Sequence, residues 1–318
     1  MPLDPALAEL IAAAEERPYV DRSKQSVEQH RGEAMQDLAE LFLEVTRRGP
    51  KMRSVTDVMV DGPRGPIRLR RYEPEAPGPL PTHVYFHGGG WWAGDLETVD
   101  DACRDFAAGV PCVVLSVDYR LAPEHPYPAP LDDCFAATCW AARQARETTP
   151  ETPLVSIGGS SAGGNLAAGV ALRARDELGP PLAAQILEIP ALDPRLDSRS
   201  MHELGDDYML TRDGMAVSWS YYLGDTKDAP TIYAAPGLAD DLSGLAPALV
   251  VTAEYDPLRD EAEHHAARLT AAGVPTEAVR YDGAIHGFGE MTAVLESARV
   301  CRERIIDFLR RHLRPTAA

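Results

Sequence analysis

The stretch Gly159-Ser160-Ser161-Ala162-Gly163 decides the fold of this chain, because it lies between a short apolar run at 154–157 and a segment of helical character at about 162–177. A Gly-x-Ser-x-Gly turn between a strand and a helix exposes its serine, and its glycines avoid collisions with the neighbouring backbone. Ser161 would then lie at a helix N-terminus, where free N–H groups favour developing negative charge. Alone, the pentapeptide is weak, since glycine and serine also cluster in ordinary solvent turns.

A second glycine-rich segment follows the apolar run at 82–86, which reads as a buried strand. It contains three successive glycines, Gly88, Gly89 and Gly90. Their N–H groups carry no shielding side chains, so they can point at a substrate oxygen and form an oxyanion hole. The alternative is a flexible turn at a strand end. His87 precedes Ser161 in the chain, which favours bracing of this loop by hydrogen bonding over the role of catalytic base.

An acid and a histidine follow two further strand-like segments. Asp256 comes after the hydrophobic run that begins at 247, and His286 follows the short strand at 276–281. A serine hydroxyl becomes a nucleophile when an imidazole takes its proton, and a carboxylate fixes the tautomer of that imidazole. The order Ser161, Asp256, His286 is the one expected of an α/β-hydrolase.

Other acids compete with Asp256 for this role. Glu254 is a near neighbour, whereas Asp260 and Glu261 are expected on the following helix. Asp256 is preferred because Pro257 ends the strand and leaves the aspartate in the loop at the carboxyl edge of the sheet.

The chain resembles the hormone-sensitive-lipase-like branch of the α/β-hydrolase fold, a group of bacterial carboxylesterases (family IV). The resemblance rests on five segments between about residues 83 and 288: His87-Gly88-Gly89-Gly90-Trp91, Asp118-Tyr119-Arg120-Leu121-Ala122-Pro123-Glu124, Gly159-Ser160-Ser161-Ala162-Gly163-Gly164-Asn165, Asp256-Pro257-Leu258-Arg259-Asp260-Glu261 and His286-Gly287-Phe288. It implies that Ser161 is the nucleophile, His286 the base and Asp256 its orienting acid. It also implies an oxyanion hole made by the N–H groups of Gly89, Gly90 and Ala162, in a loop shaped by Gly88.

Two positions depart from the family pattern. Ser160 stands where the family usually has an aspartate before the nucleophile, which leaves open what replaces the hydrogen bonds of that acid. Glu188-Ile189-Pro190 stands where related chains often carry an aromatic residue before the proline, and this difference could alter the pocket wall.

The length of 318 residues, of which 45% are hydrophobic, suits one α/β domain with a cap. Period-two alternation at 55–60 and 67–72 predicts an edge hairpin. Continuous apolar strands then alternate with helices, which predicts a mostly parallel central sheet with helices on both faces. Its strands are expected at 82–86, 112–117, 154–157 and 183–189, with helices at about 129–146 and 162–177.

Residues 1–50 are expected to form a helical cap segment, with helices at about 4–16 and 26–48, although a core helix of the main domain is the alternative. Residues 51–318 would form the catalytic domain. A cap insertion is expected at about 192–225, loop-like at 193–200 and helical at 211–223. Candidate pocket residues, for each of which ordinary packing is an alternative, are Trp91, Trp92, Ser160, Tyr208, Met209 and Trp219.

The formal net charge of −18 argues against nucleic acid and anionic membranes as partners. The sequence shows no targeting segment and no run of apolar residues long enough to span a membrane. Its five cysteines are an odd number without metal-ligand spacing, which predicts reduced thiols and a cytoplasmic location. No cofactor or metal site is expected.

These features predict a serine carboxylesterase that hydrolyses short- to medium-chain acyl esters of small molecules through an acyl-enzyme. An acyl hydrolase acting on an amide, formamide, carbonate or lactone would use the same residues and remains an alternative. A receptor without catalysis is disfavoured because His286 is retained, and a lipase working at lipid interfaces because the chain is acidic. The resemblance also implies a possible homodimer formed through the last strand and the final helix.

Overall fold

The computed structural model describes residues 1–15, 25–148 and 154–314. Its centre is an eight-stranded sheet in the order β1-β2-β4-β3-β5-β6-β7-β8. The strands are β1 Ser54–Gly62, β2 Gly65–Glu73, β3 Thr82–Phe86, β4 Val113–Asp118, β5 Val155–Ser160, β6 Ala184–Glu188, β7 Ala248–Tyr255 and β8 Thr276–Ile285.

The sheet is mostly parallel, as predicted. β1 and β2 form an antiparallel hairpin at one edge, and β2 pairs antiparallel with β4. From β4 through β3, β5, β6, β7 and β8 every neighbouring pair is parallel. The central strands β3 and β6 are buried along their whole length, which is why their sequences are continuous rather than alternating apolar runs.

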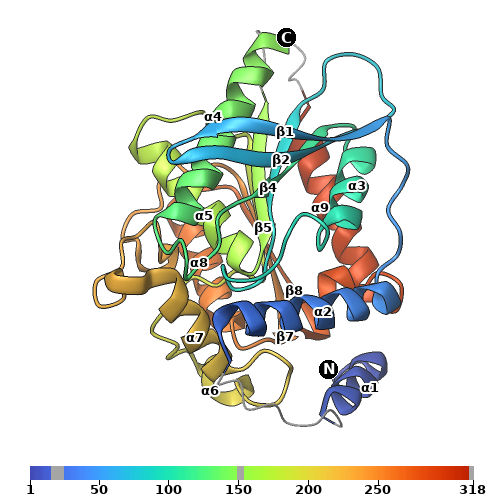
Figure 1. Cartoon of the computed structure of the whole chain (residues 1–318), viewed down its shortest axis with the longest axis vertical. Helices are drawn as coiled ribbons and strands as arrows, with labels where there is room; N and C mark the ends of the chain where they lie inside the picture. Colours follow the sequence, from blue (N-terminus) through green and yellow to red (C-terminus); the bar gives the residue numbers. More distant parts are fainter. Residues whose placement is uncertain (16–24, 149–153, 315–318) are drawn as a thin grey trace.

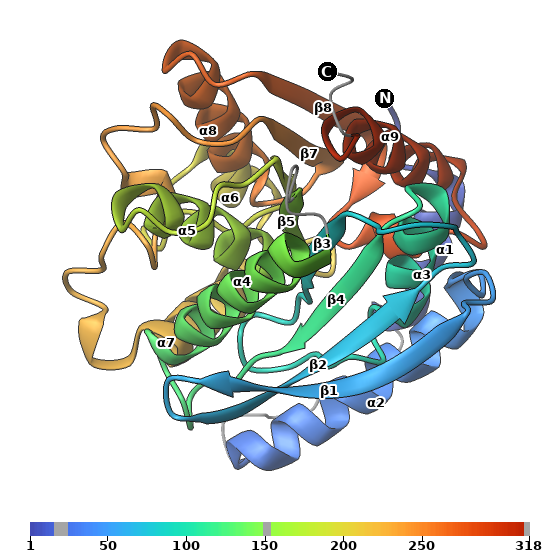
Figure 2. The same cartoon turned by 90° about the horizontal axis from the view of Figure 1, so that it is seen from above.

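Helices cover both faces of the sheet (Figure 2), so the α/β-hydrolase architecture expected from the sequence is confirmed. α4, α5 and α8 pack on one face, and α3 and α9 on the other. Each face encloses its own hydrophobic core. The bounds of these helices are α3 Asp100–Gly109, α4 Ala129–Thr148, α5 Ala162–Asp176, α8 Arg259–Ala271 and α9 Glu296–His312.

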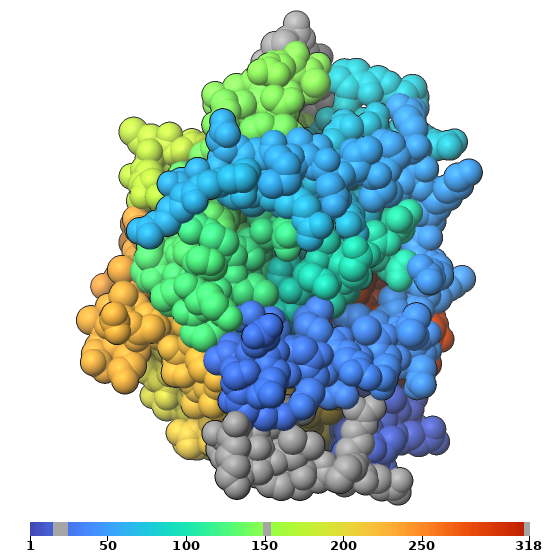
Figure 3. All heavy atoms as spheres, in the orientation of Figure 1, coloured from blue at the N-terminus to red at the C-terminus, as the bar shows by residue number. Residues whose placement is uncertain are grey.

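Four further helices lie at the end of the molecule toward which β5 runs (Figure 1). They are α1 Pro5–Glu15, α2 Val27–Val45, α6 Arg199–Leu204 and α7 Arg212–Leu223. α2 starts at Ser26, whose hydroxyl and the side chain of Gln29 form a reciprocal capping box, and it ends before the extended residue Thr46. In Figure 3 the blue atoms of α2 form much of the surface at this end, next to the gold atoms of the α6–α7 region.

The sequence placed two boundaries differently in this region. The segment 193–200 was expected to be loop-like throughout, but α6 begins at Arg199, capped by the hydroxyl of Ser198. The helix expected to reach residue 48 ends three residues earlier. Within the described ranges, none of the helices combines the length and the apolar character needed to cross a bilayer.

Candidate active site

The serine turn connects β5 to α5 and forces Ser161 into an unusual backbone conformation, with φ 57° and ψ −116°. A side chain at either glycine would collide with backbone atoms. A Cβ on Gly159 would lie 2.5 Å from the carbonyl oxygen of Phe86, and one on Gly163 would lie 1.9 Å from that same atom. The glycines therefore allow β3, β5 and α5 to meet closely behind the serine.

Ser161, His286 and Asp256 form a continuous hydrogen-bonded chain. The Nε2 of His286 lies 3.0 Å from the hydroxyl oxygen of Ser161, and its Nδ1 lies 2.8 Å from Oδ2 of Asp256. Because a carboxylate only accepts, Nδ1–H donates to Asp256, which leaves the Nε2 lone pair facing the serine hydroxyl. Asp256 is fully buried, and its second oxygen accepts the N–H of Leu258 at 2.9 Å.

The competing acids point elsewhere. A carboxylate oxygen of Glu254 accepts the N–H of Gly283 at 2.7 Å. Asp260 accepts the N–H of Ser200, and Glu261 accepts that of Leu192 at 2.6 Å. Burial raises the pKa of Glu261 well above its ordinary value, and this group holds the first residues of the expected cap insertion. Of the four acids, Asp256 is the one hydrogen-bonded to His286.

The glycine loop (residues 87–94) runs beside the serine turn. A Cβ on Gly88 would lie 3.6 Å from the Cβ of Ser161, whereas Gly89 and Gly90 have φ values of 108° and 59° that favour glycine. Among the described residues, no acceptor pairs with the N–H groups of Gly89, Gly90 or Ala162. Three free N–H donors next to a serine can stabilise an oxyanion.

His87 braces this loop, as predicted from its position before Ser161. Its Nδ1–H donates to the carbonyl oxygen of Gly88 at 2.7 Å, and its ring stacks on Tyr119 with centroids 4.2 Å apart. The hydroxyl of Tyr119 donates to the backbone oxygen of His87 at 2.9 Å. Burial lowers the pKa of His87, so the ring is held in its neutral form.

The candidate pocket residues have different surroundings. Trp91 and Trp219 are buried and pack with Tyr222, with the ring of Trp91 stacked on that of Tyr222 at 4.3 Å. This burial favours ordinary packing for both tryptophans. Trp92 is partly buried, and its Nε1–H donates to the hydroxyl of Ser218 on α7 at 3.1 Å.

The other three candidates lie apart from this aromatic cluster. Tyr208 contacts the ring of Tyr255 at a centroid distance of 4.9 Å, and the side chain of Met209 is 46% exposed. Ser160 lines a small cavity behind the serine turn, together with Glu188. Pocket lining by Trp92, Tyr208 and Met209 stays a prediction.

Two charged residues near the site are not among the candidate site residues, although Glu188 was named as a departure from the family pattern. The carboxyl group of Glu188 is buried and accepts the hydroxyl of Tyr85 at 2.9 Å; the acid in an apolar strand was the available signal. Arg31 of α2 donates to the backbone oxygen of Ala122 at 2.9 Å and pairs with Glu124 at 2.6 Å. No periodic pattern marks this arginine. In the parts of the chain that the structure covers, no cluster of histidine, cysteine or acidic side chains could hold a metal ion.

A serine, an acid and a histidine in this chain order, at the carboxyl edge of a mostly parallel sheet, define an α/β hydrolase. A family model described as "alpha/beta hydrolase fold" matches residues 83–290. The chain belongs to this family, in its hormone-sensitive-lipase-like branch, and its relatives place it among the carboxylic ester hydrolases.

The relatives cover nearly the whole chain. The esterase LipI of Mycobacterium tuberculosis is 37% identical over 97% of this chain and 94% of its own length. An arylesterase of Saccharolobus solfataricus is 36% identical over 91% of this chain and 92% of its own. The structure of a hyperthermophilic esterase from Pyrobaculum calidifontis matches with a TM-score of 0.88 and 38% identity, covering 98% of this chain and 99% of the other.

Proposed function

We propose that this protein hydrolyses carboxylic esters of small molecules through an acyl-enzyme formed on Ser161. The observation that carries the proposal is the hydrogen-bonded chain from Ser161 through His286 to Asp256, beside three free N–H groups. The enzyme class itself, carboxylic ester hydrolase, rests on the family and the named relatives.

In the proposed acylation step, Nε2 of His286 takes the proton of the Ser161 hydroxyl while the oxygen attacks the ester carbonyl. The carbonyl oxygen gains negative charge and accepts hydrogen bonds from the N–H groups of Gly89, Gly90 and Ala162. Asp256 stabilises the imidazolium through Nδ1–H. The imidazolium then returns its proton to the leaving alcohol, and the acyl group remains bound to the serine.

Deacylation repeats the same steps with water. His286 takes a proton from a water molecule as the water oxygen attacks the acyl carbonyl, and it gives that proton to the oxygen of Ser161 as the acid departs. The two half-reactions consume one ester and one water and release one alcohol and one acid.

We propose acyl chains of short to medium length as substrates. In support, α2 approaches the glycine loop through Arg31 and Met35, and α7 approaches it through Ser218. Helices this close to the oxyanion donors restrict the space for a long chain. An ethyl acetate hydrolase of Pseudomonas putida is 33% identical over 80% of this chain.

The test is a series of p-nitrophenyl esters of increasing acyl length, with Ser161→Ala beside the unmodified protein. The native protein should hydrolyse acetate to about hexanoate esters best, and Ser161→Ala should lower kcat by on the order of 10⁶. Far-UV circular dichroism verifies that the variant is folded. A folded Ser161→Ala protein that keeps near-native kcat would refute the assignment of the nucleophile.

A cytoplasmic location and a homodimer complete the proposal. All five cysteines are free thiols in the structure, which suits a reducing compartment. β8 lies at one edge of the sheet, and an edge strand can pair with a second copy of the chain. Light scattering after size exclusion measures the oligomeric state, and a mass of one chain at micromolar concentration would refute the dimer.

A further inference from the structure

Glu188 contacts the serine turn through its backbone. It is the last residue of β6 and lies opposite Ser160 in the parallel register with β5. Its carbonyl oxygen accepts the N–H of Ser161 at 2.8 Å. The residue therefore takes part in holding the backbone at the proposed nucleophile.

The side chain of Glu188 reaches the histidine loop (residues 286–290). A cavity of about 10 Å³ lies between Ser160 and Glu188 on one side and residues 287–290 on the other. This volume holds about one water molecule. A Cβ built on Gly289 would lie 3.7 Å from Oε2 of Glu188, so the carboxyl group packs against the backbone of that loop.

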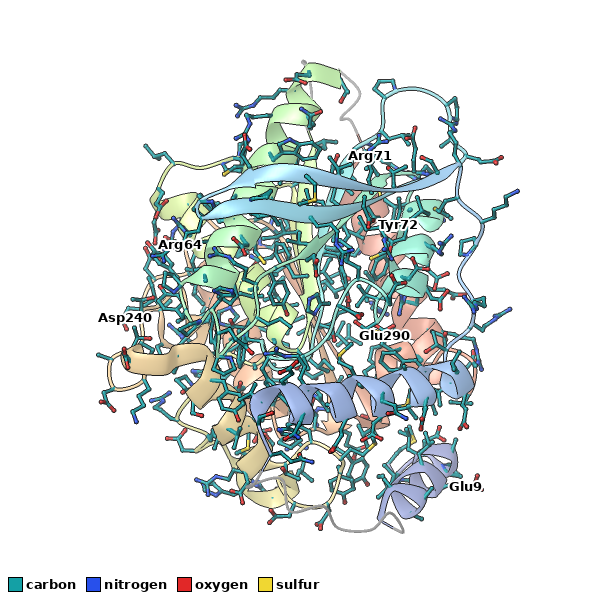
Figure 4. All side chains as sticks on the ribbon, in the orientation of Figure 1. Glu9, Arg64, Arg71, Tyr72, Asp240 and Glu290 are labelled. Carbon is teal, nitrogen blue, oxygen red and sulfur yellow. The ribbon has the colours of Figure 1, made fainter. Side chains whose placement is uncertain are left out.

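Groups from two other elements fix this arrangement. The hydroxyl of Tyr85 on β3 donates to Oε1 of Glu188 at 2.9 Å. From α9, Nη2 of Arg302 donates to the backbone oxygen of Gly289 at 3.0 Å and to Oε2 of Glu290 at 3.3 Å. Glu290 is labelled in Figure 4, where it lies beside α9. The histidine loop is thus contacted by both Glu188 and Arg302.

Charge at this site is limited by burial. Desolvation raises the pKa of Glu188 to about 7, with Arg302 acting to lower it and Glu290 to raise it. Near neutral pH a large fraction of the molecules therefore carry a protonated, uncharged Glu188. In this form the side chain contacts the loop and accepts the hydrogen bond of Tyr85 without carrying a charge. Glu290 also lines this cavity, and its carboxylate pairs with Arg302 at 3.3 Å. A further carboxyl group at position 160 would add repulsion and a desolvation penalty.

We propose that Glu188 is a positioning residue for the reaction: from behind the serine turn, its carboxyl group holds the histidine loop at the distance from Ser161 that lets His286 and the serine hydroxyl meet. The cavity is already lined by two acids, Glu188 and the Arg302-paired Glu290, and Ser160 avoids adding a third. The inference rests on the proposed function, because it assigns Glu188 a role through Ser161 and His286.

Three variants test the role of the side chain. Glu188→Gln keeps the shape and the acceptor for Tyr85, so kcat should stay within about threefold of native. Glu188→Ala removes the support of the loop, and kcat should fall about 10- to 100-fold with KM within about threefold, as small misplacements of reacting groups cause. Leu69→Ala is the matched control: it opens a cavity at a fully buried position on β2, remote from the loop, and should leave kcat within about twofold.

A second pair of variants tests whether the cavity excludes a further carboxyl group at position 160. Ser160→Asp should lower kcat at least tenfold, because it adds an acid to the cavity that Glu188 occupies. Ser160→Asp combined with Glu188→Gln should recover most of this loss. Neither variant truncates the side chain at position 188. The comparison therefore tests the role of Glu188 even if Glu188→Ala does not fold.

The inference fails if folded Glu188→Ala keeps kcat within about twofold of native, or if Ser160→Asp is as active as the native protein. It also fails if Leu69→Ala loses as much kcat as Glu188→Ala. Ser161→Ala distinguishes this failure from a failure of the proposed function. If Ser161→Ala is inactive while the Glu188 variants stay active, the role of Glu188 is refuted and the proposed function is not.

Discussion

At the scale of single residues, the serine turn leaves least room for substitution. A strand, a turn and a helix meet within a few residues, and the backbone oxygen of Phe86 fills the space where a side chain at Gly163 would lie. Because backbone atoms cannot rotate away as a flexible side chain can, any Cβ there must move β3 or α5. The strained conformation of Ser161 depends on this close packing.

Gly163→Ala should therefore destabilise the protein by about 3 kcal/mol or more, the range of severe overpacking. Gly32→Ala is the matched control, since a Cβ at Gly32 on α2 meets nothing within 4 Å. Gly32→Ala should raise the free energy of unfolding by about 0.5–1 kcal/mol, because alanine favours the helix more than glycine does. Urea unfolding of both variants measures the two free energies, and a Gly163→Ala protein as stable as native would contradict the packing described for the turn.

At the scale of elements, α2 connects the two loops that flank Ser161. Near its start, Arg31 donates to the backbone oxygens of Trp92 and Ala122, on and beside the glycine loop. Just past its end, the hydroxyl of Thr46 donates to the backbone oxygen of Glu290 at 2.8 Å, in the histidine loop. One helix thus restrains both the glycine loop and the histidine loop.

Arg31→Ala should lower kcat/KM by on the order of tenfold. Hydrogen bonds that involve a charged group contribute about 1.5–3 kcal/mol each, and losing those from Arg31 would loosen the glycine loop. Gln36→Ala is the control on the same helix, where the amide is exposed and donates to Glu40 at 2.9 Å. Steady-state kinetics with p-nitrophenyl acetate compares them. Equal kcat/KM in the two variants would show that α2 does not support the loop.

Most elements followed from the sequence because their signals are local. Continuous apolar runs gave the strands β3 to β6, and the alternation at 55–60 and 67–72 gave the edge hairpin. α6 was missed because a helix of six residues has too few turns to show a periodic pattern. The packing of Trp91 against Trp219 and Tyr222 depends on the placement of α7, which local patterns do not determine.

The same distinction applies to the site. The grouping of Ser161, Asp256 and His286 could be predicted because each follows a strand that ends at the same edge of the sheet. Glu188 was noticed only as a departure in the pocket wall. Its contact with the histidine loop joins β6 to a segment about 100 residues later, and no spacing rule covers such a distance.

At the scale of the whole molecule, buried acids make the stability depend on pH. The pKa of Glu188 is about 7 in the folded protein and 4.5 ordinarily, so between these pH values the folded state keeps a proton that the unfolded state has lost. This contribution to stability is fully present below pH 4.5 and is lost as the pH rises through 7. The difference corresponds to about 3 kcal/mol.

Glu188→Gln removes this ionisation. The stability of the variant relative to the native protein should therefore increase by about 3 kcal/mol between pH 4.5 and pH 8. Urea unfolding of both proteins at the two pH values measures the change. A difference that stays constant would mean that the pKa of Glu188 is the same in the folded and unfolded protein, so burial would not raise it.

The reaction of the protein with a p-nitrophenyl phosphonate tests the central claim most directly, because phosphorus bonds to the activated nucleophile and the adduct persists. Peptide mass spectrometry should locate one phosphonyl group per chain on Ser161, with p-nitrophenol released in equal amount. His286→Ala should slow the labelling at least 10³-fold, in line with the effects of removing a triad histidine. An adduct on another residue, or labelling of His286→Ala at the native rate, would contradict the account.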